Sequence, residues 1–231
     1  MGVLSPAMRL LAVCIVFALP CSPAGGQSPK KRPTLLVSVC AYDGVFASVP
    51  YSEDRLGERI EITRIGDTEL QAGYEPGHSE SPTFRVVRQG KTISSFTVEE
   101  MYSGNTWIAV DPGGDRFALT YSDESIGGDV RVFQMNGDVV TDVPNATQKA
   151  TADFKSRHYC QARGNTVRAL KWIKGDLLLT TGVYPTGDCG SDARHIEAYR
   201  VSVPDGTIKQ HLTLAQLKRY PGLCFQNDDG N

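Results

Sequence analysis

Residues 130–140 read VRVFQMNGDVV, two runs of strand-forming residues joined at Asn136-Gly137. Valine and phenylalanine favour strands, and an Asn-Gly pair favours a tight turn that needs positive φ. This stretch therefore predicts a β-hairpin. The same layout recurs at residues 84–93 (FRVVRQGKTI) and 198–208 (AYRVSVPDGTI). Three such hairpins predict a chain built mainly from antiparallel strands.

A helix-start pattern follows each hairpin at a nearly fixed distance. A threonine or asparagine lies seven or eight residues after the turn glycine, with Glu or Gln three positions later: Thr97 and Glu100, Asn145 and Gln148, Thr213 and Gln216. This spacing is typical of a capping box at the start of a helix. We therefore expect each hairpin to lead into a short helix.

Two hairpins are also preceded by a strand–turn–strand pattern. In one copy, residues 107–110 (WIAV) cross a turn at residues 111–115 into residues 117–120 (FALT). In the other, residues 169–173 (ALKWI) cross Lys174-Gly175-Asp176 into residues 177–180 (LLLT). The pattern predicts about four strands per unit and a repeat architecture. Strand-forming runs within residues 35–71 add a divergent further unit, giving three to four units in all.

This repeat pattern resembles small exported β-propeller-like proteins with degenerate four-stranded repeats. The resemblance covers about residues 66–217 and depends on layout, without a diagnostic motif. It implies an all-β fold, either a small β-propeller or a radial array of antiparallel sheets with short connecting helices. Residues 111–115 (DPGGD) also resemble the calcium loop of integrin-type propeller repeats, but they lack its alternating carboxylates. The missing carboxylates disfavour calcium at this loop. For the chain as a whole we expect no bound metal and no cofactor.

The first 26 residues have the pattern of a secretory signal peptide. Arg9 precedes an apolar run at residues 10–19, and small residues end the segment before Gln27. A start at Met8 gives a shorter leader, and Cys21 leaves open a lipoprotein, although Pro20 disfavours lipid attachment. We expect residues 27–33 to be a flexible tail and residues 34–231 to be one β-rich domain. The protein would then be secreted or periplasmic, with no membrane span in the mature chain.

Charge and cysteine content bear on the partner and on the disulfides of the protein. The net charge of −2, with a single basic block at residues 30–32, gives no electrostatic case for nucleic acid. Four cysteines follow the leader, and an even number in an exported chain indicates two disulfides. Three pairings are possible, and we favour Cys160–Cys189 and Cys40–Cys224. The size, leader and cysteine count also resemble periplasmic immunity proteins that neutralise cell-wall-degrading toxins.

The sequence lacks the common catalytic motifs, such as Gly-x-Ser-x-Gly and His-Glu-x-x-His. Its densest polar cluster, residues 187–195 (GDCGSDARH), supplies three weak catalytic or metal-binding candidates, Asp188, Asp192 and His195. We favour a solvated loop there. A zinc site is a second hypothesis, made from two Cys and two His: His158, Cys160, Cys189 and His195. We interpret His78 as a loop residue, His211 as a packing residue, and Trp107 and Trp172 as core residues.

The function that we expect is extracytoplasmic binding or inhibition without catalysis, because loops on a rigid frame usually carry contacts. Residues 121–128 and 184–194 occupy equivalent places in two repeats. Their candidate binding residues are Tyr121, Asp123, Glu124, Tyr184, Asp188 and Arg194. Such acidic loops favour another extracytoplasmic protein as the partner. The alternative is an extracytoplasmic hydrolase or lyase that uses the Asp/His cluster.

Overall fold

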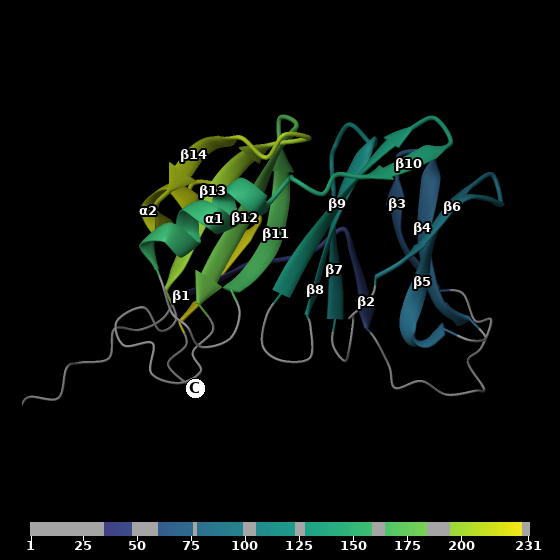
Figure 1. Cartoon of the computed structure of the whole chain (residues 1–231), viewed down its shortest axis with the longest axis horizontal. Helices are drawn as coiled ribbons and strands as arrows, with labels where there is room; N and C mark the ends of the chain where they lie inside the picture. The colour runs from purple at the N-terminus through teal and green to yellow at the C-terminus, as the bar shows by residue number, and fades with distance from the viewer. Residues whose placement is uncertain are drawn as a thin grey trace, which may run out of the picture. The chain divides into compact units, whose positions relative to one another are not determined.

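A computed structural model describes residues 35–47, 60–75, 78–98, 105–122, 128–158, 165–183 and 195–227 (Figure 1). This part of the chain is mostly β-strand, in antiparallel sheets with few helices. No helix within it is long and apolar enough to cross a membrane.

Three antiparallel meanders make up most of the described structure. The β3–β6 sheet contains β3 (Ile60–Ile65), β4 (Thr68–Glu75), β5 (His78–Arg88) and β6 (Lys91–Thr97). The β7–β10 sheet contains β7 (Asn105–Val110), β8 (Arg116–Ser122), β9 (Gly128–Asn136) and β10 (Val139–Asp142), and β2 (Gly44–Ala47) pairs with β7 at its edge. The β11–β14 sheet contains β11 (Asn165–Ile173), β12 (Asp176–Val183), β13 (Ile196–Ser202) and β14 (Ile208–Leu212).

These meanders confirm the four-strand unit that the sequence predicts. Each predicted glycine hairpin joins the third and fourth strands of its sheet: β5 to β6, β9 to β10, and β13 to β14. The two strand–turn–strand segments form β7–β8 and β11–β12. The described sheets show no closed barrel or propeller, so the confirmed description is an antiparallel β fold with few helices.

The helix predictions are confirmed in part. Thr213 and Gln216 form the expected capping box at the start of α2 (Leu214–Leu217). The helix α1 (Gln148–Arg157) also forms, but its N-cap is Thr147 rather than Asn145. A hydrogen bond from Ala146 N to Val143 O closes a turn just before the helix, so the helix begins two residues later than expected. Thr97 is extended at the end of β6, and residues 99–104 lie outside the described part.

Two apolar cores join the sheets. One packs Leu70 and Phe84 of the β3–β6 sheet against Phe117 and Phe133 of the β7–β10 sheet. The Phe117 and Phe133 rings stack with their centroids 4.9 Å apart. The other core combines α1, the β7–β10 sheet and the β11–β14 sheet. There the buried Trp172 donates from Nε1 to the Ala109 carbonyl oxygen at 3.0 Å, as expected for a core residue.

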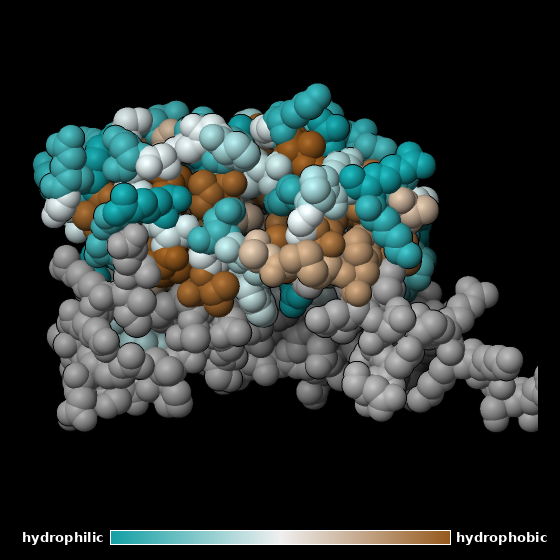
Figure 2. Space-filling model, turned by 180° about the vertical axis from the view of Figure 1, so that it is seen from behind, coloured by the Kyte–Doolittle hydropathy of each residue, from teal (hydrophilic) through white to brown (hydrophobic). Residues whose placement is uncertain are grey.

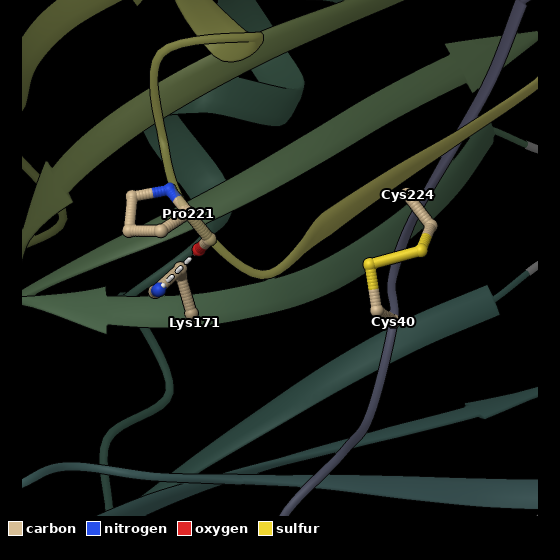
Figure 3. Close-up of a disulfide and its surroundings, with 4 residues drawn as sticks. All are labelled: Cys40, Lys171, Pro221 and Cys224. Carbon is tan, nitrogen blue, oxygen red and sulfur yellow. Dashed lines mark hydrogen bonds between the residues drawn. A yellow bond between two sulfur atoms is a disulfide. The ribbon is translucent and has the colours of Figure 1, made fainter.

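The described ends of the chain are joined by a strand pair and a disulfide. The strand β1 (Leu35–Val39) pairs with β15 (Leu223–Asn227), and Cys40 is bonded to Cys224 (Figure 3). This is the pairing favoured for Cys40 from sequence. Lys171 of β11 donates to the Pro221 carbonyl oxygen at 2.7 Å, which ties the turn before β15 to the β11–β14 sheet. Cys160 and Cys189 lie outside the described residues.

We expect replacement of Cys40 and Cys224 together by serine to lower the free energy of unfolding by about 2–5 kcal/mol. The bond closes a loop across 184 residues of sequence, so its loss releases the unfolded chain from a long-range constraint. Urea unfolding of both proteins under oxidising conditions measures the change. A loss below about 1 kcal/mol contradicts the structural role of this bond.

Two turn glycines provide a matched comparison. Gly90 and Gly206 both have positive φ, 73° and 64°. A Cβ at position 90 meets nothing within 4 Å, whereas one at position 206 lies 2.1 Å from the Asn145 carbonyl oxygen. Gly90→Ala should therefore cost only the backbone strain, about 1–2 kcal/mol, and Gly206→Ala about 1–3 kcal/mol more. If thermal unfolding shows the same loss of stability in both variants, the backbone at Asn145 can shift to make room for the added Cβ.

Candidate functional site

Polar side chains, rather than an apolar patch, mark the candidate site. Figure 2 shows hydrophobic residues lying between hydrophilic ones on one face of the molecule. The most exposed large hydrophobic side chains in the described ranges are Val45, Val139 and Leu214, which belong to three separate elements, β2, β10 and α2. A dense group of charged and aromatic side chains instead gathers at one end of the β11–β14 sheet.

The two ends of the β11–β14 sheet differ. At one end, the strands are joined by the two-residue turn Lys174-Gly175 and by residues 203–207. Alternate connections of a meander lie at the same end of the sheet. The other end therefore holds the last residue of β12, Val183, and the first residues of β11 and β13, Asn165 and Ile196. The polar group lies at this second end.

Glu197 on β13 is at the centre of the group, with only 10% of its side chain exposed. Arg157, the last residue of α1, donates from Nη1 to Glu197 Oε1 at 2.7 Å and from Nη2 to Oε2 at 2.6 Å. The Tyr199 hydroxyl donates to Glu197 Oε2 at 2.6 Å. Asp153 Oδ2 accepts from Arg157 at 2.6 Å and lies 3.0 Å from the Tyr199 hydroxyl. The helix end and the strand are thus joined through one carboxylate.

Three histidines also face Glu197. The Nε2 atoms of His158 and His195 lie 3.0 and 3.4 Å from Oε1, and His211 Nε2 lies 3.2 Å from Oε2. The His158 and His195 rings stack with centroids 4.0 Å apart, and His211 stacks on Tyr199 at 4.9 Å. We call Glu197, Arg157, Asp153, Tyr199 and these histidines the Glu197 cluster.

Local structure explains how these side chains meet. His195, Glu197 and Tyr199 alternate along the chain, and alternate residues of a strand face the same side. Tyr199 is opposite His211 in the β13–β14 ladder, which places that histidine beside it. His158 directly follows α1 and reaches the same point from the helix. The alternation His-x-Glu-x-Tyr was the signal in the sequence for Glu197, which our sequence analysis missed.

The charges of Glu197, Arg157 and Tyr199 are set by their contacts. Burial raises the pKa of the Glu197 carboxyl, but hydrogen bonds from Arg157, Tyr199 and His158 outweigh burial and lower that pKa to about 2. The hydrogen bond to Glu197 raises the pKa of Arg157, and burial and the two carboxylates raise the pKa of Tyr199. Glu197 is therefore an anion near neutral pH, while Arg157 and Tyr199 keep their protons.

The predicted catalytic and metal candidates are only partly described. His195 belongs to the Glu197 cluster, whereas Asp188 and Asp192 lie outside the described residues. Of the predicted Cys/His zinc set, His158 and His195 are adjacent, and the two cysteines are outside the described ranges. His211, expected as a packing residue, does stack on Tyr199, but 46% of its side chain is exposed and it also contacts Glu197.

Tyr121 is the one predicted binding residue within the described ranges. It lies on β8, is 8% exposed, and lines a cavity of about 690 Å³ between β9, β10 and α1. Arg131 and Lys155 also line this cavity, and Asp142 accepts from Arg131 Nε at 2.9 Å. The remaining binding candidates fall in the undescribed connections: Asp123, Glu124, Tyr184, Asp188 and Arg194.

We expect Glu197→Gln to lower the free energy of unfolding by about 1–3 kcal/mol, because Arg157 and Tyr199 then lose a charged hydrogen-bond acceptor whose side chain is only 10% exposed. Glu69→Gln is the matched control, since Glu69 pairs with Arg64, whose side chain is 73% exposed. Exposed pairs contribute about 0–1 kcal/mol. Chemical unfolding measures the free energy of unfolding of both variants. An equal decrease in the two would contradict the central structural role of Glu197.

No protein-family model, curated protein or solved structure matches this chain. What the Glu197 cluster can do must therefore be judged from its geometry. It offers a fixed anion, a guanidinium from α1 and three imidazoles at the end of the sheet opposite the Lys174-Gly175 turn.

Proposed function

We propose that this chain is an exported, secreted or periplasmic protein that binds or inhibits another extracytoplasmic protein without catalysis. The contacts would be made at the end of the β11–β14 sheet that carries the Glu197 cluster and the connection of residues 184–195. The observation that carries this proposal is the difference between the two ends of that sheet. Tight turns close one end, and charged and aromatic groups gather at the other.

A rigid frame supports this proposal. Apolar cores join the three meanders, and the strands that hold the longer connections are therefore fixed. Recognition residues are often placed on loops that such a frame positions. Each meander has its four strands in chain order, as a propeller blade does. We extend the proposal to a radial, propeller-like arrangement of these sheets.

The charge state of Glu197 favours a role in binding over a role as a general base. An efficient general base needs a pKa near the working pH, and the pKa of Glu197 is lowered to about 2. The pKa of Tyr199 is raised by burial and by its acceptors, so its hydroxyl remains a donor. These two groups hold charge and position rather than transfer protons.

The cavity beside α1 adds a second surface that carries charged residues among apolar ones. It is lined by Tyr121, by the cations Arg131 and Lys155, and by the carboxylates of Asp129 and Asp142. Tyr121 lies near the end of β8, and residues 123–127, which include Asp123 and Glu124, follow that strand in the sequence. These two acidic residues suit a partner with a basic surface, such as a basic secreted enzyme.

Immobilised, oxidised protein should capture one saturable partner from the producer's extracytoplasmic fraction or from secretions of competing cells. Reversing charge with Asp123→Lys and Glu124→Lys should weaken that binding at least about tenfold, because like charges then face each other. Asp67→Lys with Asp138→Lys is the control, since both aspartates are exposed at turns and pair with Arg88. Unchanged affinity in the first variant contradicts a contact through residues 123–127, and no partner from either source contradicts the binding proposal itself.

A further inference from the structure

Three atoms of the Glu197 cluster have the spacing of ligands around one metal ion. His158 Nε2, His195 Nε2 and a carboxylate oxygen of Glu197 all lie within 4.8 Å of one another. The two nitrogens are 3.0 and 3.4 Å from Glu197 Oε1. Tetrahedral zinc with bonds of about 2.0–2.2 Å separates its ligand atoms by about 3.3–3.6 Å. The two N···O separations are close to this spacing, and sharing one ion requires the stacked His158 and His195 rings to turn so that both Nε2 atoms face it.

Hydrogen bonding alone does not account well for this convergence. Oε1 of Glu197 faces Arg157, His158 and His195. Oε2 faces Arg157, Tyr199 and His211. A carboxylate offers about four lone-pair sites, fewer than these contacts require. An ion shared by Oε1 and two neutral imidazoles would convert the two crowded N···O contacts into coordination, with the Nε2 lone pairs facing the ion.

The surroundings of Glu197 are those of a supported ligand. Metal-binding carboxylates are usually held by further hydrogen bonds that fix their orientation. Arg157 and Tyr199 both donate to Glu197, and Asp153 in turn accepts from Arg157. Arg157, Asp153 and Glu197 together carry one net negative charge, which favours a cation. The side chain of His195 is 42% exposed, so this ligand is in contact with solvent.

We propose that His158, His195 and Glu197 bind one divalent transition-metal ion, with Zn²⁺ as the representative. Imidazole nitrogens suit zinc, copper, nickel and iron, whereas calcium and magnesium prefer all-oxygen sites. This donor set replaces the two cysteines of the Cys/His hypothesis with Glu197. His211 contacts the other carboxylate oxygen and acts as an outer partner that helps to hold Glu197.

Calorimetric titration of Zn²⁺ into the metal-free, oxidised protein tests the site. We expect one ion per chain and at least about tenfold weaker binding in His195→Ala, because that variant removes a ligand. His195 is partly exposed, so this variant should keep its fold, which circular dichroism verifies. His78→Ala is the matched control, since His78 is the histidine outside the cluster and its loss should leave the affinity unchanged.

Two independent measurements complete the test. Zn²⁺ should raise the thermal unfolding temperature of the wild-type protein but not that of His195→Ala, because ligand bound to the folded state stabilises it. Co²⁺ should give visible absorption bands without a thiolate charge-transfer band in the near ultraviolet. No stoichiometric Zn²⁺ binding, or equal binding in His195→Ala, overturns the proposal. A thiolate band also overturns it, by assigning the ion to Cys160 and Cys189.

Discussion

The register of β13 between β12 and β14 is the constraint on which the Glu197 cluster depends. Glu197 is opposite Thr181 of β12, and Tyr199 is opposite His211 of β14. A slip by one residue would turn every side chain of a strand to the other face. That slip would remove the fully buried Tyr199 and Val201 from the core that α1 shares, and would bring Arg200 into it. Core packing thus fixes which side chains meet at the sheet end.

The same core positions the helical half of the cluster. Ala150 and Phe154 of α1 are fully buried in the apolar core that also contains Tyr199 and Val201. Residues three and four positions apart lie on one side of a helix. Arg157 and His158 follow Phe154 at these spacings, so burial of the Phe154 ring directs them to Glu197. The position of α1 therefore determines both the packing of Phe154 in the core and the contacts of Arg157 and His158 with Glu197.

Features set by local sequence were predictable, and apart from the Cys40–Cys224 pairing those set by tertiary contacts were not. The hairpins were visible because a turn glycine between strand-forming runs is a local signal, and the Thr213 cap because its partner is three residues away. Asn145 fits the same pattern, yet a turn at Val143 moves the cap to Thr147. The Glu197 cluster combines α1, β13 and β14. The zinc hypothesis had already grouped His158 with His195, and the alternation of His195, Glu197 and Tyr199 was the signal for Glu197.

The low pKa of Glu197 links the frame to both proposed roles. Donors from α1 and β13 hold its carboxylate as an anion, although burial opposes that charge. An anion fixed in this way accepts protons poorly near neutral pH, but its charge and position are constant. Constant charge and position are what a recognition surface or a metal ligand requires. The arrangement that argues against proton transfer by Glu197 is thus the one that suits it to hold a cation at the end of the sheet.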